Sequence, residues 1–136
     1  MGGPQITARD GLAAELEERL YAFNRVASGH HDGQELEFAV EEDGETLAGL
    51  AGYTWGGMAQ VNQLWVREDH RHTGLGSALM RRAIEEAKAR GCQLMFLTTH
   101  SFQAPGFYAR LGFEELAVIR DKPPGHAEHI LRLTLS

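Results

Sequence analysis

A six-residue turn, Arg71 to Gly76 (RHTGLG), separates an apolar, strand-like run at 61–66 from a long amphipathic helix. Its two glycines let the main chain approach a ligand without an intervening Cβ. The first N–H groups of the helix have no intrahelical partner, and a helix N-terminus carries about half a positive charge. The turn therefore predicts a site for a phosphate-bearing ligand, held mainly by main-chain donors, with Arg71 as an added cation.

The residues around this turn exclude two common nucleotide-binding motifs. A dinucleotide-binding turn needs a third glycine, which this helix lacks, and a P-loop needs a Gly-Lys-Ser/Thr sequence, which the chain lacks. On six residues alone, a simple strand-to-helix connection that binds nothing remains an equal alternative.

Composition limits the classes of partner. The chain has 136 residues, 43% hydrophobic and 24% charged, which predicts one folded domain over 1–136. Thirteen basic and 19 acidic residues give a net charge of −6, which argues against a nucleic-acid groove and suits a cationic substrate. We expect no membrane span and a cytoplasmic location. The single Cys92, expected to be buried, allows no internal disulfide, and His126 and His129 lack a third metal ligand, so no metal is predicted.

Hydrophobic periodicity predicts an alternation of helices and strands in a mixed α/β (α+β) order. Asp10 is the expected N-cap of a first helix that ends near Asn24. Hairpin turns are expected at Asp43-Gly44 and Gly56-Gly57. The remaining expected elements are strands at 35–42, 46–55, 59–66, 94–98, 113–119 and 129–135, a helix at 74–90, and a short helix through 107–111.

Two motifs in this order resemble the GCN5-related N-acetyltransferase (GNAT) superfamily. One is the turn Arg71 to Gly76, and the other is the run Phe107 to Phe113 (FYARLGF). The segments 101–108 and 123–126 resemble a small single-domain bacterial branch of it. The resemblance implies a central, twisted, mostly antiparallel sheet of about six to seven strands, flanked by helices. A splayed strand pair within that sheet would bind acetyl-CoA.

The resemblance also implies where acetyl-CoA binds. The diphosphate would meet main-chain amides of the turn, and the pantetheine arm would run along the strand that precedes it. Ser101 occupies a position where the family often has a cofactor-binding Asn, although it is equally a candidate helix N-cap. The implied cofactor-binding residues are Leu64, Trp65, Val66, Arg71, His72, Thr73, Gly74, Leu75, Gly76, Ser77, Ser101, Phe107 and Tyr108. We expect the Trp65 side chain itself to lie in the core.

Acetyl transfer to an amine needs a proton acceptor and a proton donor. Only about one alkylamine in a few thousand is uncharged at neutral pH. Tyr108 matches the family's donor to the departing thiolate, with packing beside Phe107 as its alternative role. His100 is the candidate base, with a surface histidine as the alternative. In the bacterial branch an acidic residue is common at position 98 and an aromatic one at position 100, so Thr98 and His100 leave the acceptor open.

The implied reaction is direct attack of an amine of a small cationic molecule on acetyl-CoA. The candidate acceptor-binding residues are His30, His31, Glu35, Trp55, Thr98 and His100, and Glu37 is a further candidate for cation recognition. Alternatives are a protein or peptide lysine or N-terminal acetyltransferase, and a non-catalytic acyl-CoA-binding protein. The apolar strand Ile130 to Leu135 pairs across a possible homodimer or completes its own sheet.

Overall fold

The computed structural model describes residues 2–135 and divides the chain into two compact units, residues 1–31 and 32–136. The expectation of a single domain over the whole chain stays a prediction. No helix in the described residues is long and apolar enough to cross a membrane.

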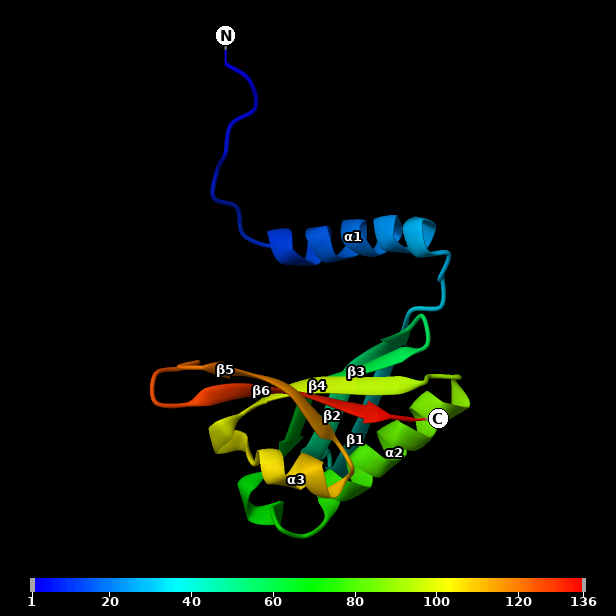
Figure 1. The fold of residues 1–136 in the computed structure, drawn as a ribbon, viewed down its shortest axis with the longest axis vertical. Coiled ribbons are helices and arrows are strands. Elements are labelled where there is room, and N and C mark those ends of the chain that lie inside the picture. Colours follow the sequence, from blue (N-terminus) through cyan, green and yellow to red (C-terminus); the bar gives the residue numbers. More distant parts are fainter. Residues whose placement is uncertain (1, 136) are drawn as a thin grey trace. The chain divides into compact units, whose positions relative to one another are not determined.

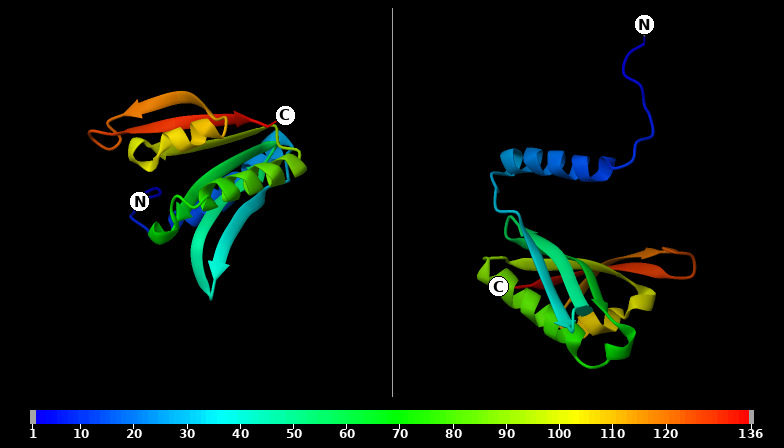
Figure 2. Two further views of the ribbon diagram at one scale, coloured as in Figure 1. Left: turned by 90° about the horizontal axis from the view of Figure 1, so that it is seen from below. Right: turned by 180° about the vertical axis from the view of Figure 1, so that it is seen from behind.

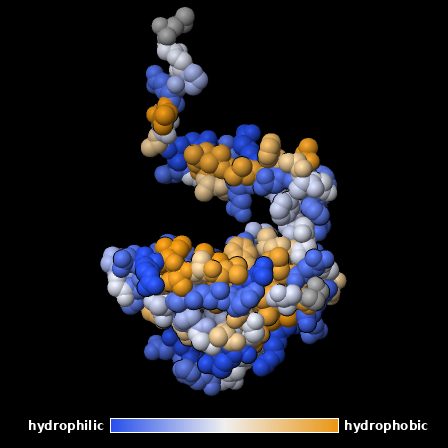
Figure 3. Space-filling view, viewed as in Figure 1, coloured by the Kyte–Doolittle hydropathy of each residue, from blue (hydrophilic) through white to orange (hydrophobic). Residues whose placement is uncertain are grey.

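The first unit contains one helix, α1 (Leu12–Ser28). The predicted cap at Asp10 was wrong: Gly11 is the N-cap, in a left-handed conformation (φ 77°) that glycine adopts without strain. The helix ends at Ser28, four residues beyond the expected end at Asn24. Gly29 is its C-cap, and the Gly29 N–H donates to the Arg25 carbonyl. None of the residues of α1 is buried, and its apolar side chains are exposed (Figure 3).

The second unit is a six-stranded sheet in the order β1-β2-β3-β4-β6-β5, with helices on one face (Figures 1 and 2). This mixed, mainly antiparallel sheet confirms the expected fold class. The strands are β1 (Gln34–Glu42), β2 (Glu45–Trp55), β3 (Met58–Val66), β4 (Leu94–His100), β5 (Glu114–Arg120) and β6 (Ala127–Thr134). The helices are the 3-10 turns η1 (Glu68–His70) and η2 (Ser101–Gln103), together with α2 (Leu75–Ala89) and α3 (Pro105–Arg110).

The core lies between the sheet and the helices α2 and α3. Strand side chains alternate between two faces, so one set from each strand meets the helices. The buried members include Leu36, Leu50, Val61, Met80, Met95, Leu97, Tyr108 and Leu131. Cys92 is also buried, as expected. We call this the helix-covered face and the other side of the sheet the opposite face.

Strands β3 and β4 form the parallel pair of the described sheet, and their pairing stops early. Only Met58 to Gln60 pair with Leu94 to Phe96, whereas β3 continues to Val66 and β4 to His100. Strands β1–β3 and β4–β6 fan apart in Figure 2. We call residues 61–66 of β3 and 97–100 of β4 the splayed segments.

A bulge in β3 coincides with this divergence. Ala51 pairs with Gln63 and Gly52 with Val61, so Asn62 has no partner on β2. A Cβ on Gly52 would lie 1.9 Å from the Gln60 carbonyl oxygen, so a residue without a side chain is required there. A bulge bends its strand and increases the local twist, which turns β3 away from β4.

Strand β6 lies between β4 and β5, so it completes its own sheet. Of the two alternatives left open for Ile130 to Leu135, this is the second, because both hydrogen-bonding edges of β6 are used within the chain. The edge strands are β1 and β5. A homodimer through another surface stays a prediction.

Candidate active site

The glycine turn forms a cradle of main-chain donors at the start of α2. Gly74 is the N-cap of α2 in a left-handed conformation (φ 92°), and the first bond within the helix runs from the Ala78 N–H to the Gly74 carbonyl. Within the described residues, the N–H groups of positions 75–77 therefore have no protein partner. The first turn of α2 also carries no acidic residue. Free donors and a positive helix end suit a diphosphate.

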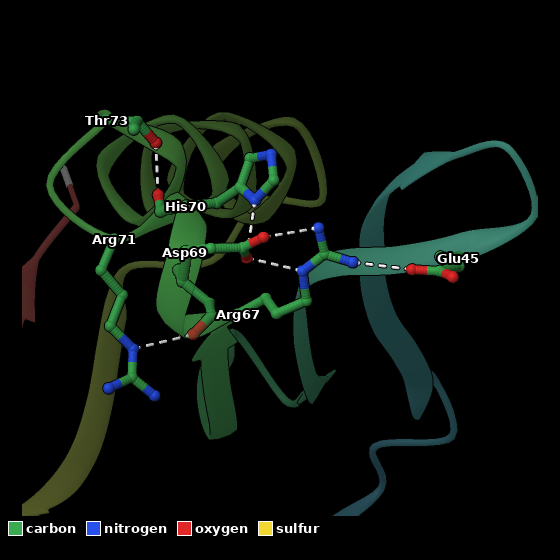
Figure 4. A network of polar contacts seen from close by, with 7 residues as sticks. Glu45, Arg67, Asp69, His70, Arg71 and Thr73 are labelled. Atoms are coloured by element: carbon green, nitrogen blue, oxygen red, sulfur yellow. Dashed lines mark hydrogen bonds and ion pairs between the residues drawn. The ribbon is translucent and has the colours of Figure 1, made fainter.

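A polar network fixes the chain between β3 and this cradle (Figure 4). The Arg67 guanidinium donates to both carboxylate oxygens of Asp69, at 2.6 and 2.9 Å, and to Glu45 at 2.7 Å. His70 Nδ1 lies 2.9 Å from Asp69, and the Thr73 hydroxyl donates to the His70 carbonyl. The hydrogen bonds from Arg67, and then from His70, hold the pKa of Asp69 well below its usual range. Asp69 thus stays ionised, and the bidentate pair orients η1.

The Arg71 side chain turns away from Thr73 and toward the end of β3 (Figure 4). Its Nε donates to the Val66 carbonyl at 3.0 Å. Through this bond Arg71 orders the junction between the cradle and the splayed segments.

Helix α3 meets the cradle through its aromatic residues. A Cβ on Gly76 would lie 3.6 Å from the Phe107 ring, which shows how closely α3 approaches the first turn of α2. Tyr108 is 9% exposed and packs edge-on against Phe107 and Phe113. Burial raises the pKa of its phenol. The hydroxyl makes no hydrogen bond within the described part of the chain, so its proton is available to a ligand.

Leu64, Trp65 and Val66 form the end of the splayed segment of β3, beside this cradle. These residues pair with β2 on one side and have no β4 partner on the other. A ligand with amide groups is able to bind such a strand edge. The expectation that the Trp65 side chain lies in the core is wrong, because its indole is 49% exposed on the opposite face.

His100 lies on the opposite face at the end of β4 and is held on two sides. Its Nδ1 and its backbone N–H both contact Gln103 Oε1, at 3.0 and 2.8 Å. Its ring stacks on Phe102, with centroids 5.1 Å apart. Its Nε2 lies 3.6 Å from Glu128 Oε2 on the neighbouring strand, because His100 and Glu128 are register partners. Thr98, also on β4, is exposed two residues earlier.

Ser101 does not cap a helix. His100 is the N-cap of η2, and the Ser101 hydroxyl instead accepts a hydrogen bond from the Ala127 N–H at 3.1 Å. This bond ties η2 to the start of β6. The Ser101 hydroxyl proton remains to be donated, so a contact with the cofactor stays a prediction.

The other predicted acceptor residues are not gathered at the splayed segments. Glu35 pairs with Tyr53, and Trp55 pairs with Met58, in the rows of the sheet where β3 and β4 are still joined. His30 and His31 belong to the unit of residues 1–31.

A hollow of about 380 Å³ lies on the sheet, and Glu37, Gln63 and Trp65 are among the residues that line it. Gln63 and Trp65 belong to the splayed segment of β3, whereas Glu35 and Trp55 lie farther from it. The hydrogen bond that the protonated Glu37 carboxyl donates to Glu35, and then the negative charge of Glu35, raise the pKa of Glu37. Of these three lining residues, Glu37 is the further candidate for cation recognition, whereas Gln63 and Trp65 were not among the expected acceptor-binding residues. Strand alternation would have placed Glu37 beside Glu35, but Gln63 and Trp65 depend on the bulge.

Comparison with known proteins decides the family. The acetyltransferase (GNAT) family matches residues 5–113. The chain belongs to this family. The blasticidin-S acetyltransferase of Streptomyces morookaense is 44% identical to this acetyltransferase over 97 residues, which cover 69% of this chain and 70% of that protein.

Solved structures agree with this family. A crystal structure of a Bacillus cereus acetyltransferase has a TM-score of 0.82 and 29% identity, and the match covers 97% of this chain and 98% of that one. A structure from Agrobacterium tumefaciens has a TM-score of 0.85 and 27% identity, with 98% and 99% covered. GNAT acetyltransferases use acetyl-CoA, and this chain is an acetyltransferase with that cofactor. The free amides at the start of α2 and the unpaired edge of β3 fit its diphosphate and its amide-containing arm.

Proposed function

We propose that this acetyltransferase transfers the acetyl group of acetyl-CoA to an amine of a small cationic molecule by direct attack. One observation carries the proposal: the cradle begins α2, which packs on the helix-covered face, whereas a histidine and carboxylates lie on the opposite face. Donor and acceptor would therefore approach the reacting carbon from different sides. The opposite face carries Glu35, Glu37 and Glu128, and the chain has a net charge of −6.

The names of relatives support a small acceptor. The Streptomyces morookaense relative is named for blasticidin S, and a Streptomyces lavendulae relative, 33% identical over 92 residues, is named for streptothricin. We carry over from these names only the class, a small amine-bearing molecule. A cytoplasmic location stays a prediction.

Each proposed residue has a defined task. Bound acetyl-CoA supplies an activated acyl carbon as a thioester. The free main-chain amides of residues 75–77 would hold the diphosphate, and the edge of β3 at residues 64–66 would orient the arm. His100 accepts a proton from the attacking nitrogen as the N–C bond forms. Tyr108 donates its proton to the sulfur as the C–S bond breaks.

Magnitudes explain why both groups are needed. Freeing an alkylamine of its proton at neutral pH costs about 4 to 5 kcal/mol, because the reference pKa is about 10.4. A positioned base typically contributes about 10²- to 10⁴-fold in rate. A phenol is within about two pKa units of a thiol, so transfer to the departing sulfur is well matched.

A thiol-release screen with acetyl-CoA tests the proposal. The panel contains blasticidin S, streptothricin, polyamines, aminoglycosides, amino acids and lysine peptides. We expect turnover with at least one small cationic amine, at a kcat/KM about tenfold or more above that of any peptide, because a small polycation meets several carboxylates at once. Preference for peptides would establish the protein-modifying alternative. Tight coenzyme A binding without turnover on any amine would establish the non-catalytic one.

A further inference from the structure

We propose that Glu128 is the residue that binds the ammonium group of the acceptor, and that the Lys122 side chain occupies this position when no acceptor is bound. This inference rests on the proposed function for its role in catalysis. Its evidence is independent of that function, since it comes from the contacts of one carboxylate on β6.

The structure already shows a primary ammonium at this carboxylate. Lys122 Nζ lies 2.9 Å from Glu128 Oε2. The same oxygen lies 3.6 Å from His100 Nε2, which is too long for a hydrogen bond between the two. An ammonium at the position of Lys122 Nζ is thus bound to a carboxylate whose other neighbour is the proposed base.

The contacts of Gln103 hold the His100 ring in place beside Glu128. The backbone N–H of His100 donates to the amide oxygen of Gln103 at 2.8 Å, and His100 Nδ1 lies 3.0 Å from that oxygen. The backbone N–H of Gln103 donates in turn to the His100 side chain. These contacts occupy the Nδ1 edge of the ring, so Nε2 is the nitrogen on the side of the Glu128 carboxylate.

The Glu128 and Lys122 side chains differ in how far they are buried. The Glu128 side chain is 12% exposed, and the strand register with His100 fixes its position. The Lys122 side chain is 53% exposed and belongs to the loop between β5 and β6. A screened, exposed cation contributes little to stability, whereas a largely buried carboxylate needs a partner. A substrate ammonium is therefore able to displace Lys122 at small cost.

Affinity for n-propylammonium, followed through the His100 ring resonances by NMR, tests this inference without requiring acetyl transfer. Lys122→Met is expected to bind the probe about two- to fivefold more tightly, because the Lys122 ammonium no longer competes for Glu128 and an exposed ion pair contributes about that factor. Glu128→Gln is expected to bind it about tenfold or more weakly, because a charge-assisted contact is lost.

Two matched variants separate displacement from a general charge effect. Lys122→Arg keeps the cation and should retain the affinity of the natural protein. Lys88→Met removes the same charge from the exposed face of α2, and should leave affinity unchanged. Coenzyme A affinity of each variant reports an intact fold.

The two proposals fail in different ways. An unchanged affinity in Glu128→Gln, or an unchanged or weaker one in Lys122→Met, would overturn the role of Glu128, even if the enzyme acetylates amines. Absence of turnover on the whole amine panel, with the probe affinities as expected, would instead remove the proposed function and leave the ammonium site in place. Where an acceptor is found, its KM should follow the probe affinities while kcat in Lys122→Met stays within about twofold.

Discussion

Replacing Tyr108 by phenylalanine is expected to lower kcat by about 100-fold or more while changing coenzyme A affinity by less than about twofold. The Tyr108 ring packs between Phe107 and Phe113, and phenylalanine keeps both contacts. The hydroxyl makes no hydrogen bond within the described residues, so its loss leaves no buried group without a partner. The change therefore removes a proton donor and little else. Steady-state kinetics and calorimetry measure the two quantities.

The pH dependence provides a second readout of Tyr108. Burial raises the pKa of its phenol, so the donor keeps its proton throughout the neutral range and loses it only above about pH 10, the ordinary value. Activity in the natural protein should fall at that alkaline limit, and Tyr108→Phe should lack this limb. Tyr21→Phe, on α1, is the matched control and should retain normal kcat. Turnover in Tyr108→Phe within about threefold of the natural enzyme would exclude this residue as the donor.

Replacing Ser77 by aspartate is expected to weaken coenzyme A binding by about 30- to 100-fold. Ser77 is the third residue of α2, where the N–H groups have no intrahelical partner and no acidic residue is present. A carboxylate there competes for the same donors and repels a diphosphate. At an effective dielectric constant of about 20, two like charges about 4 to 5 Å apart repel by about 3 to 4 kcal/mol, before screening by salt.

The same change should not weaken the fold, which makes the experiment decisive. An acidic residue in the first turn of a helix stabilises it by about 0.3 to 1 kcal/mol. Ser77→Asp should therefore raise the free energy of unfolding slightly while it abolishes most cofactor binding. Ser77→Asn has nearly the same shape without the charge, and should bind coenzyme A within about threefold of the natural protein. Equal cofactor affinity in the two variants would contradict a diphosphate at this helix end.

Local chemistry in the sequence predicted the elements whose shape a few adjacent residues determine. The turns at Asp43-Gly44 and Gly56-Gly57 all have positive φ, as hairpin turns of this kind require. The amphipathic period of α2 and the glycine at its start likewise determined the cradle. These features need no knowledge of distant parts of the chain.

The face of the sheet on which Trp65 lies could not be predicted from neighbouring residues. In an uninterrupted strand Val61, Gln63 and Trp65 would share one face. Because Asn62 has no partner on β2, Val61, Leu64 and Val66 share the helix-covered face instead, and Trp65 turns outward. A bulge reverses the alternation after it, and nothing in the run of residues marks its place.

The sequence by itself determined that this chain has a cradle of main-chain donors followed by an amphipathic helix, because glycine conformation and helix ends are properties of neighbouring residues. Only the tertiary structure decided what lies around it. The bulge separates β3 from β4, and the register of β4 with β6 brings Glu128 beside His100. Strand register depends on the packing of the whole sheet, so residues far apart in the chain meet only when every strand is in place.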